Sequence, residues 1–292
     1  MKTAKITDQL YPRYLLAPSI AIYLVFFIVP IIGGIFLSFT NWNISRPEIS
    51  FNGLDNYIYM FKDSDFRLAI SNTLIFAVSV IVLRNIFALL LALVLTKGLK
   101  ATNYLRTTFY IPSVLSYVVV GIMFTSLFQM NGTVNQILNG FGIPIEHEWI
   151  GSYETALLTV IIMDVWKWTG FHMVIYIAGL MAIPRDYYEA SRIDGASSFK
   201  QFKYITLPLL VPALTINITQ SAIGGFRVFE QVLTLTGGGP GKQSTVIGMM
   251  IYENFGRGYY GRSTAMGMLL SFIVIIATLI IRRFFDRKET SY

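Results

Sequence analysis

The stretch SNTLIFAVSVIVLRNIFALLLALVLT, residues 71–96, contains a single charged side chain, that of Arg84. A bilayer core about 30 Å thick is crossed by about 20 consecutive, mostly apolar helical residues, so this stretch is long enough to span a membrane. Further runs of comparable length and polarity lie near residues 14–37, 107–128, 156–178, 207–235 and 264–285. We therefore predict an all-α integral membrane protein with about six transmembrane helices.

The composition agrees with this class. Hydrophobic residues make up 54% of the chain, charged residues make up 13%, and the mean hydropathy is +0.58, whereas soluble domains average about 25% charged residues. The apolar runs are continuous, unlike the alternating segments of about ten residues that build outer-membrane barrels. The chain has no cysteine, and its two histidines, His147 and His172, lie in different segments. We therefore expect no disulfide, no thiol chemistry and no bound metal.

The distribution of basic residues predicts the orientation of the helices. If both termini are cytoplasmic, more than half of the 23 lysines and arginines fall in cytoplasmic segments, as the positive-inside rule requires. The net charge of +7 is then spread over separate segments, so nucleic acid is not an expected partner. No small-x-small cleavage pattern follows the run at 14–37, which we interpret as a retained helix with Trp42 as an interfacial anchor.

Several charges fall within the predicted spans, where each costs roughly 2.5–3.5 kcal/mol at a helix centre. Arg84 lies in the second span, Asp164 and Lys167 in the fourth, and Arg227 and Glu230 in the fifth. The last four form two i, i+3 couples, so each couple can neutralise itself on one helix face. They predict either self-paired polar patches inside the bundle or the lining of a path for a polar substrate. A proton relay fits less well, because relay groups usually lack such a partner.

The glycine-rich stretch GGGPGKQST, residues 237–245, superficially suggests nucleotide binding. A phosphate loop requires G-x-x-x-x-G-K-[ST], but Thr236 stands at the first glycine position and Gln243 follows Lys242. We therefore predict a tight turn without ATP binding, in which Gly237–Gly239 allow positive φ angles and Pro240 ends the helix.

A polar segment, PRDYYEASRIDGASSFKQF at residues 184–202, separates the fourth and fifth runs. Asp186 is a plausible helix N-cap, with Glu189 at the third helical position as in a capping box. The pattern predicts a short helix over 187–193 that ends near Gly195, followed by a second short helix over 197–204. From these residues alone, a capped interhelical loop and a docking site for another protein are equally good interpretations.

Residues 189–208, EASRIDGASSFKQFKYITLP, resemble the EAA loop of bacterial ABC importer permeases, whose pattern is E-A-A-x-x-x-G-x9-I-x-L-P. Ser191 replaces the third residue of that pattern. Four further segments resemble the carbohydrate-uptake branch, which includes the maltose and glycerol-phosphate permeases. They are LSFTNW at 37–42, GLDNY at 53–57, AGLMAIPRDYYEA at 178–190 and FRVFEQVLTLTGGGP at 226–240. The resemblance covers nearly the whole chain.

The resemblance implies one transmembrane permease domain over residues 1–292, located in the bacterial plasma or inner membrane. The first helix and an external loop would occupy 1–70, and the core bundle 71–285 would include the coupling loop 184–208. The implied partners are a second, homologous permease subunit, two ATPase subunits and an extracellular solute-binding protein. This chain would have no catalytic site and bind no cofactor, since ATP and Mg²⁺ belong to the ATPases. It would carry a sugar into the cell by alternating access.

The resemblance also assigns residues to the coupling of ATP hydrolysis. Glu189 would offer a carboxylate to the ATPase, Gly195 would permit a close turn, and Ala190 and Ala196 would keep the loop slim enough to enter a cleft. The residues implied in coupling are Glu189, Ala190, Ser191, Asp194, Gly195, Ala196, Ile205, Leu207 and Pro208.

The resemblance places the substrate path along the helix before the glycine-rich turn. The implied residues are Asn217, Gln220, Ser221, Gly224, Gly225, Arg227, Val228 and Glu230. The two glycines could make room for a sugar ring or let helices pack closely. Maltose-type paths have asparagines where this chain has glycine and valine, so we expect another oligosaccharide, with a phosphorylated polyol as the alternative. An ion-coupled secondary transporter is a weaker alternative, because no inverted repeat is visible.

Overall fold

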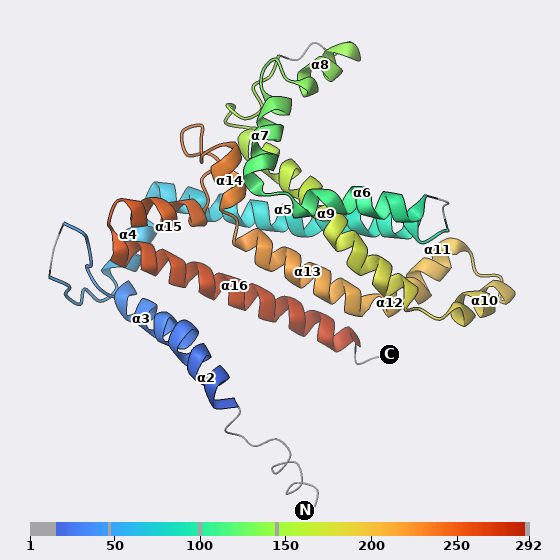
Figure 1. The fold of residues 1–292 in the computed structure, drawn as a ribbon, viewed down its shortest axis with the longest axis horizontal. Helices are drawn as coiled ribbons and strands as arrows, with labels where there is room; N and C mark the ends of the chain where they lie inside the picture. Colours follow the sequence, from blue (N-terminus) through green and yellow to red (C-terminus); the bar gives the residue numbers. More distant parts are fainter. Residues whose placement is uncertain (1–15, 46–47, 99–100, 144–145, 290–292) are drawn as a thin grey trace, which may run out of the picture. The chain divides into compact units, whose positions relative to one another are not determined.

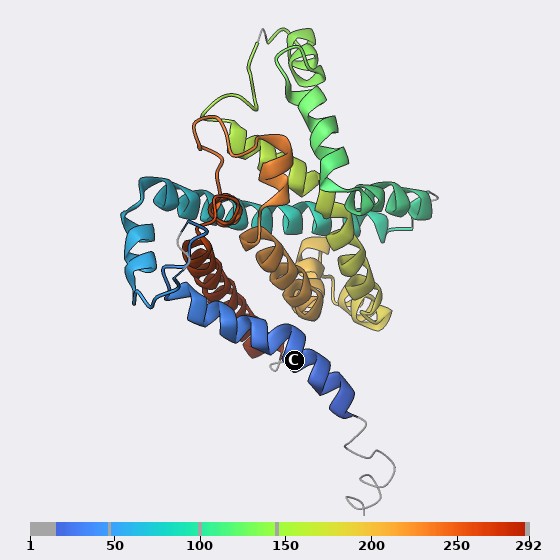
Figure 2. The ribbon, with the colours of Figure 1, turned by 60° about the vertical axis from the view of Figure 1, so that its left-hand side comes forward.

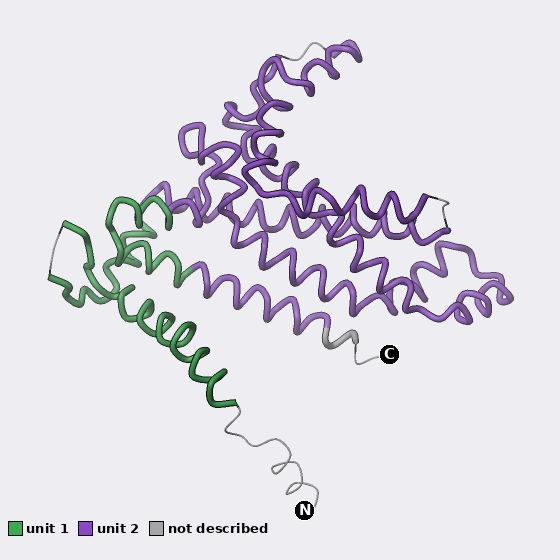
Figure 3. Tube along the Cα trace, viewed as in Figure 1, with its two compact units in different colours: residues 1–62, 251–269 green, residues 63–250, 270–292 purple. Residues whose placement is uncertain are grey.

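The computed structural model describes residues 16–45, 48–98, 101–143 and 146–289. The chain forms two compact units, Met1–Lys62 with Ile251–Leu269 (unit 1) and Asp63–Met250 with Leu270–Tyr292 (unit 2), which are coloured separately in Figure 3. The described ranges are helical and contain no strand beyond an isolated bridge between Thr40 and Phe51. The all-α prediction is therefore confirmed, while the single permease domain over 1–292 stays a prediction.

Unit 1 contains the first apolar run. Helix α2 (Ala17–Tyr23), a π-helical turn η2 (Leu24–Ile28) and α3 (Val29–Ser38) form a candidate span of 22 residues with a mean hydropathy of 2.8. Helices that are apolar on every side are typical of membrane spans. The residues at 14 and 15, which begin the predicted run, lie outside the described residues. A short helix α4 (Asp55–Lys62) completes the N-terminal part of the unit.

The core of unit 2 consists of three helices, α5 (Ser64–Leu95), α9 (Ala156–Met181) and α13 (Val211–Phe226), which pack side by side (Figures 1 and 2). Small buried residues on α5, among them Ala77, Ala88 and Ala92, allow the backbones to approach closely, as is usual between membrane helices. Helix α6 (Thr102–Val114) packs along α9. Two further helices, α15 (Ile247–Gly256) and α16 (Tyr260–Glu289), include residues of each unit.

The third predicted span, 107–128, is not one helix. Helix α6 ends at Val114, and α7 (Tyr117–Phe128) begins after two extended residues. Pro112 cannot donate a backbone hydrogen bond, which weakens the last turn of α6. Ser116 then caps α7 by accepting from the Val119 N–H at 3.4 Å. Within unit 2, α7 and the following α8 (Thr133–Gly140) extend away from α5 and α9 (Figures 1 and 2).

The fifth predicted span, 207–235, is also interrupted. The helical run Ser198–Leu209 comprises α11 (Ser198–Gln201), the π-helical turn η3 (Phe202–Thr206) and α12 (Leu207–Leu209), and it bends by 69° into α13. A second break follows α13, before α14 (Glu230–Leu235). By length and apolarity, the described residues contain five candidate membrane spans, or six if the bent pair counts as one span. The five are Ala17–Ser38, Ser64–Leu95, Tyr117–Gly140 (α7 with α8), Ala156–Met181 and Tyr260–Phe285.

Candidate functional site

The polar segment between α9 and α13 contains the helix α10 (Arg185–Ile193). It starts directly after Pro184, and no side chain caps its N-terminus. The predicted N-cap at Asp186 and its capping box with Glu189 are therefore wrong. Asp186 instead lies in the first turn, where a carboxylate interacts favourably with the helix dipole.

The predicted end of α10 at Gly195 is confirmed. Gly195 has a φ angle of +72°, which residues with a Cβ rarely adopt. The Ala196 N–H donates to the Ser191 carbonyl at 2.9 Å, and the Gly195 N–H donates to the Arg192 carbonyl at 3.1 Å. These two bonds form a Schellman motif, which reverses the chain directly after α10.

Side-chain hydrogen bonds fasten α10 to the helical run that follows it. The Tyr188 hydroxyl lies 2.9 Å from Thr206 Oγ1, and Gln201 Nε2 donates to Ser191 Oγ at 2.9 Å. The predicted second helix over 197–204 begins as expected with Ser197 as its N-cap, but it continues to Leu209. Ser191, the one departure from the EAA pattern, thus joins the two helices.

The outer surface of this segment carries exposed apolar side chains. Ile193 is 88% exposed, Phe199 72% and Tyr204 67%. Glu189 is also exposed. The three apolar residues are not among the implied coupling residues, although they stand beside charged residues in a polar segment. Exposed apolar side chains surrounded by charges are typical of protein-docking surfaces. We call residues 184–208 the coupling segment.

The other implied coupling residues lie on the same segment. Ala190, Asp194 and Leu207 are exposed, while Ala196, Ile205 and Pro208 are half-buried.

A buried ion pair joins α5 to α9 in the core of unit 2. Arg84 Nε donates to Asp164 Oδ2 at 2.9 Å, Nη2 of Arg84 pairs with the same oxygen, and both side chains are at most 3% exposed. Tyr117 and Gln231 donate to Asp164 Oδ1 at 3.1 and 3.2 Å. The predicted pairing of Asp164 with Lys167 is therefore wrong, because donors from α5, α7 and α14 occupy the carboxylate.

Lys167 instead stabilises the break between α6 and α7. Its ammonium donates to the carbonyls of Pro112, Ser113 and Leu115 at 3.3, 3.0 and 2.5 Å. The last carbonyls of a helix lack partners within it and attract cations. Lys167 therefore anchors the end of α6 to α9.

A second polar cluster lies between α5, α9 and α13. The Tyr176 hydroxyl donates to Asn85 Oδ1 at 2.5 Å, and Asn85 Nδ2 donates to Ser221 Oγ at 3.1 Å. Ser221 Oγ lies 3.2 Å from His172 Nε2, and His172 Nδ1 lies 2.8 Å from Asn217 Oδ1. All five side chains are buried. Asn217 and Ser221, two of the implied substrate-path residues, thus face the interior of this subunit.

Two further implied path residues also serve packing. A Cβ on Gly225 would lie only 2.9 Å from Val80 Cγ2 and 3.0 Å from Ala77 Cα, so glycine permits the close approach of α13 to α5. Val228 is fully buried in the main apolar cluster, together with Val80. Of the two explanations given for Gly225, close helix packing is the one that the structure supports.

The remaining implied path residues are less buried, and Glu230 among them begins α14 after the break behind α13. Gln220, Arg227 and Glu230 are exposed, and Gly224 is half-buried. Residues 220, 224 and 227 follow one face of a helix. We call these four residues the α13 stripe. The described side chains of Arg227 and Glu230 form no ion pair, so their predicted self-pairing is wrong.

The glycine-rich segment forms a turn as predicted, but Gly239 does not have the expected positive φ angle. Gly237, Gly238 and Gly241 have positive φ angles. Asn72 on α5 donates to the carbonyls of Gln243 and Thr245 at 2.7 and 2.9 Å, which fixes the turn to the core of unit 2.

Comparison with solved structures assigns the fold. A chain of a bacterial ABC transporter involved in the import of the acidic polysaccharide alginate matches with a TM-score of 0.82 and 25% sequence identity, covering 98% of both chains. The fold of long apolar helices around a polar core is therefore that of an ABC importer permease.

The chain belongs to the family of binding-protein-dependent transport system inner membrane components, whose profile matches residues 84–290. It is 33% identical to the probable ABC transporter permease protein YurN of Bacillus subtilis over 95% of this chain and 97% of that protein. It is 34% identical to the trehalose/maltose transport system permease protein MalF of Thermococcus litoralis over 91% and 90% of the two chains. It is 33% identical to the arabinooligosaccharides transport system permease protein AraP of Bacillus subtilis over 92% and 86%.

Proposed function

We propose that this chain is the permease subunit of an ABC importer that moves an oligosaccharide across the bacterial plasma membrane, driven by partner ATPases that dock on the coupling segment. The observation that carries the proposal is the exposed surface of this segment, with Ile193, Phe199 and Tyr204 beside Glu189. Such a surface fits a cleft in a partner protein. The family's dependence on a binding protein supports delivery of the substrate by an extracellular solute-binding protein.

The connections of the coupling segment suggest how it would drive transport. The segment joins α9 to α13, and the bonds of His172 with Asn217 and Ser221 hold these two helices together. A pull on the segment would therefore move α9 and α13 as one body. The Arg84–Asp164 pair would carry the movement to α5. Rigid-body rotation of this kind is an established way to switch access between two sides.

The α13 stripe is the best candidate for this subunit's share of the substrate path. Charged side chains inside a membrane face protein or water, because exposure to lipid is costly. Gln220, Arg227 and Glu230 would therefore face the space shared with a second, homologous permease subunit. These side chains offer donors and acceptors for sugar hydroxyls, and the relatives named for saccharide transport support this substrate class. A phosphorylated polyol, drawn to Arg227, is the second candidate.

The proposal assigns no bond-breaking step to this chain. ATP and Mg²⁺ would act in the partner ATPases, and both termini of this chain would lie on the ATPase side of the membrane. An ion-coupled carrier is less well supported, because Asp164 is fully engaged by Arg84, Tyr117 and Gln231.

The coupling role is tested by substrate-stimulated ATP hydrolysis in the reconstituted complex with its binding protein. We expect Glu189→Ala and Gly195→Asp each to abolish most of the stimulation, because one removes the docking carboxylate and the other disturbs the turn after α10. Binding of substrate to the binding protein should not change.

Matched controls separate docking from folding. Gly142 has a φ angle of +78° with open space around it, as Gly195 does, so Gly142→Asp should cost a similar strain of about 1 kcal/mol and leave stimulation intact. Glu154→Ala, which removes an exposed carboxylate just before α9, is the control for Glu189→Ala. Normal stimulation and transport by both coupling variants would show that the docking role is wrong.

The α13 stripe gives a separate prediction. Gln220→Leu and Arg227→Leu should each lower the transport rate about tenfold, equivalent to about 1.4 kcal/mol, by removing contacts with the moving substrate. Because both side chains are exposed, the free energy of unfolding should change by less than about 0.5 kcal/mol. Transport into proteoliposomes measures the effect, and the exposed Gln129, changed to leucine, is the control. Unaltered transport in both stripe variants would show that the substrate path does not run along the α13 stripe.

A further inference from the structure

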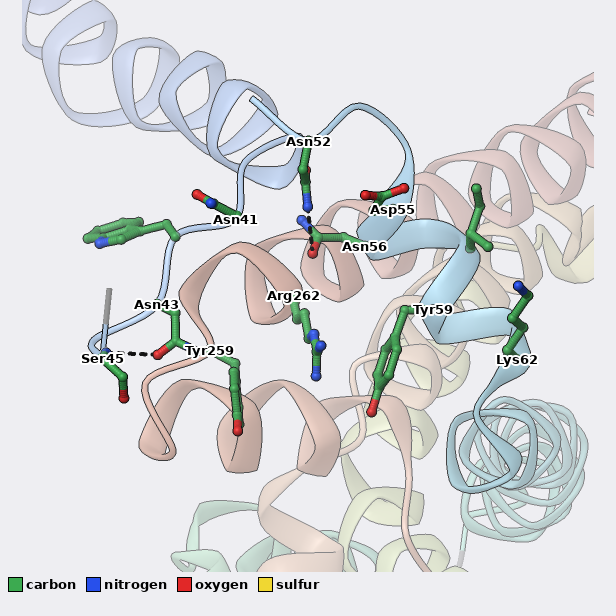
Figure 4. Close-up of a pocket in the computed structure, with 12 residues that line it drawn as sticks. Asn41, Asn43, Ser45, Asn52, Asp55, Asn56, Tyr59, Lys62, Tyr259 and Arg262 are labelled. Carbon is green, nitrogen blue, oxygen red and sulfur yellow. Dashed lines mark hydrogen bonds between the residues drawn. The ribbon is translucent and has the colours of Figure 1, made fainter. Parts of the chain in front are cut away.

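Unit 1 contains a polar pocket that is part of neither the coupling segment nor the α13 stripe. It has a volume of about 800 Å³, within the range of about 300–1,000 Å³ that is usual for small-molecule sites. Its walls come from the segment after α3, from α4 and from the residues around the start of α16 (Figure 4). The lining residues used below are Asn41, Trp42, Asn43, Asp55, Tyr59, Tyr259 and Arg262.

The walls of the pocket are fixed by hydrogen bonds within unit 1. The buried Asn56 donates to the carbonyls of Ser38 and Thr40, both at 2.8 Å, and thereby ties α4 to the end of α3. The Gly261 N–H donates to the Trp42 carbonyl at 3.0 Å. A Cβ on Gly261 would collide with the Thr40 carbonyl, so glycine is required for this approach. The pocket is therefore formed before any ligand binds.

Arg262 is positioned between two aromatic rings. Its guanidinium carbon lies 3.8 Å from the ring centroid of Tyr59 and 5.0 Å from that of Tyr259, and Figure 4 shows the side chain between the two rings. The described residues include no carboxylate in an ion pair with Arg262. A guanidinium held between two tyrosine rings keeps its N–H groups available for the oxygens of a ligand.

Two asparagines provide further oriented donors. Asn41 Oδ1 accepts from the Ser50 N–H at 2.8 Å, and Asn43 Oδ1 accepts from the Ser45 N–H at 2.9 Å. With each side-chain oxygen bound to the backbone, the NH₂ group of each amide has no hydrogen-bond partner among the described residues and remains a donor. The exposed Asp55 carboxylate adds an acceptor.

We infer that this pocket binds one or more sugar units of a saccharide, at a site separate from the α13 stripe. Its fixed N–H donors and its carboxylate suit vicinal hydroxyls, and the ring of Trp42 suits the apolar face of a pyranose, while the rings of Tyr59 and Tyr259 position Arg262. A carboxylate or hydroxyl pair of the sugar would bind Arg262 in bidentate fashion. The inference rests on the proposed function only for the class of ligand.

The test is direct binding to the permease–ATPase complex in lipid nanodiscs, without the binding protein. The probes are maltotriose, arabinotriose and a trimeric uronate, titrated by calorimetry. We expect at least one to bind, and Arg262→Ala to raise its dissociation constant at least about tenfold. Arg257→Ala, an exposed arginine of the same unit that does not line the pocket, should leave binding unchanged. Asn43→Ala is a second test variant if Arg262→Ala does not assemble.

The outcomes distinguish this inference from the proposed function. Binding of a neutral probe or of the uronate, lost in Arg262→Ala, supports the pocket and identifies the preferred sugar. Absence of binding by every probe, or equal binding by the Arg262 and Arg257 variants, overturns it. If the wild-type complex transports a saccharide but its pocket binds no probe, the proposed function stays intact. Pocket binding without saccharide transport would overturn the proposed substrate instead.

Discussion

Replacing Asp164 with alanine is expected to destabilise the permease by about 3–5 kcal/mol, because the change leaves the Arg84 guanidinium buried without its partner. The loss reaches further than one pair. Tyr117 and Gln231 both donate to Asp164, so α7 and α14 each also lose one hydrogen bond to α9. Reversible unfolding of the full-length chain in lipid–detergent micelles measures the difference.

Two comparisons make this prediction specific. Glu154→Ala removes an exposed carboxylate and should change the free energy of unfolding by less than about 0.5 kcal/mol. The double variant Arg84→Met, Asp164→Leu replaces both charges with apolar groups and should recover the part of the stability that the unpaired Arg84 costs, since a buried pair is often replaceable by well-packed apolar residues. The hydrogen bonds from Tyr117 and Gln231 to Asp164 stay lost in this variant. Equal effects of the Asp164 and Glu154 variants would show that the buried pair does not hold α5 to α9.

The long spans could be predicted because membrane crossing depends on a local property. Length and apolarity alone identified the runs at 14–37, 71–96, 156–178 and 264–285. The described parts of these runs lie almost entirely within the helical spans Ala17–Ser38, Ser64–Leu95, Ala156–Met181 and Tyr260–Phe285. The break at 115–116 interrupts the apolar pattern only at Ser116, so hydropathy could not reveal it. The break at 227–229 coincides with Arg227, and the charges there were instead interpreted as a self-paired patch or a substrate path. Pro112 was a local signal for the first break. Lys167, whose ammonium binds the carbonyls at this break, lies more than fifty residues away in the sequence.

The ion pairs show why spacing alone misleads. Positions three apart share a helix face, which made Asp164 and Lys167 natural partners. The spacing rule says nothing about donors from other helices, and Arg84, 80 residues away, binds the carboxylate instead. A signal was present: Arg84 was the one intramembrane charge without an opposite charge at helical spacing. A buried charge of that kind must find a partner elsewhere in the fold.

The coupling segment was predicted more fully than the substrate path. The chain reversal at Gly195 could be predicted from the sequence, because a glycine directly after a helix often adopts the positive φ angle that ends it. The path residues came from a resemblance along one helix, and α13 divides them between two faces. Asn217, Ser221 and Gly225 pack inside the subunit, whereas Gln220, Arg227 and Glu230 are exposed. Burial depends on which neighbours α13 has, and a single sequence does not specify them.

Gly170→Ala is expected to destabilise unit 2 by about 1–3 kcal/mol or more, although it adds only one methyl group. A Cβ at this position would overlap the backbone carbonyl of Phe109 and lie 2.9 Å from the Tyr110 nitrogen. Backbone atoms cannot rotate away as a side chain does, so α6 would have to separate from α9. That separation would also weaken the bonds from Lys167, one turn earlier on α9, to the end of α6.

The control for Gly170 is a glycine in an equally helical but open position. A Cβ on Gly267 in α16 would have no neighbour within 4 Å, so Gly267→Ala should be neutral or stabilise the chain by up to about 1 kcal/mol through its better helix propensity. Unfolding of the two variants in lipid–detergent micelles compares them directly. If the Gly170 variant is as stable as the Gly267 variant, α6 does not depend on direct backbone contact with α9. In that case Lys167 alone would hold the two helices together, and Lys167→Met should then release α6.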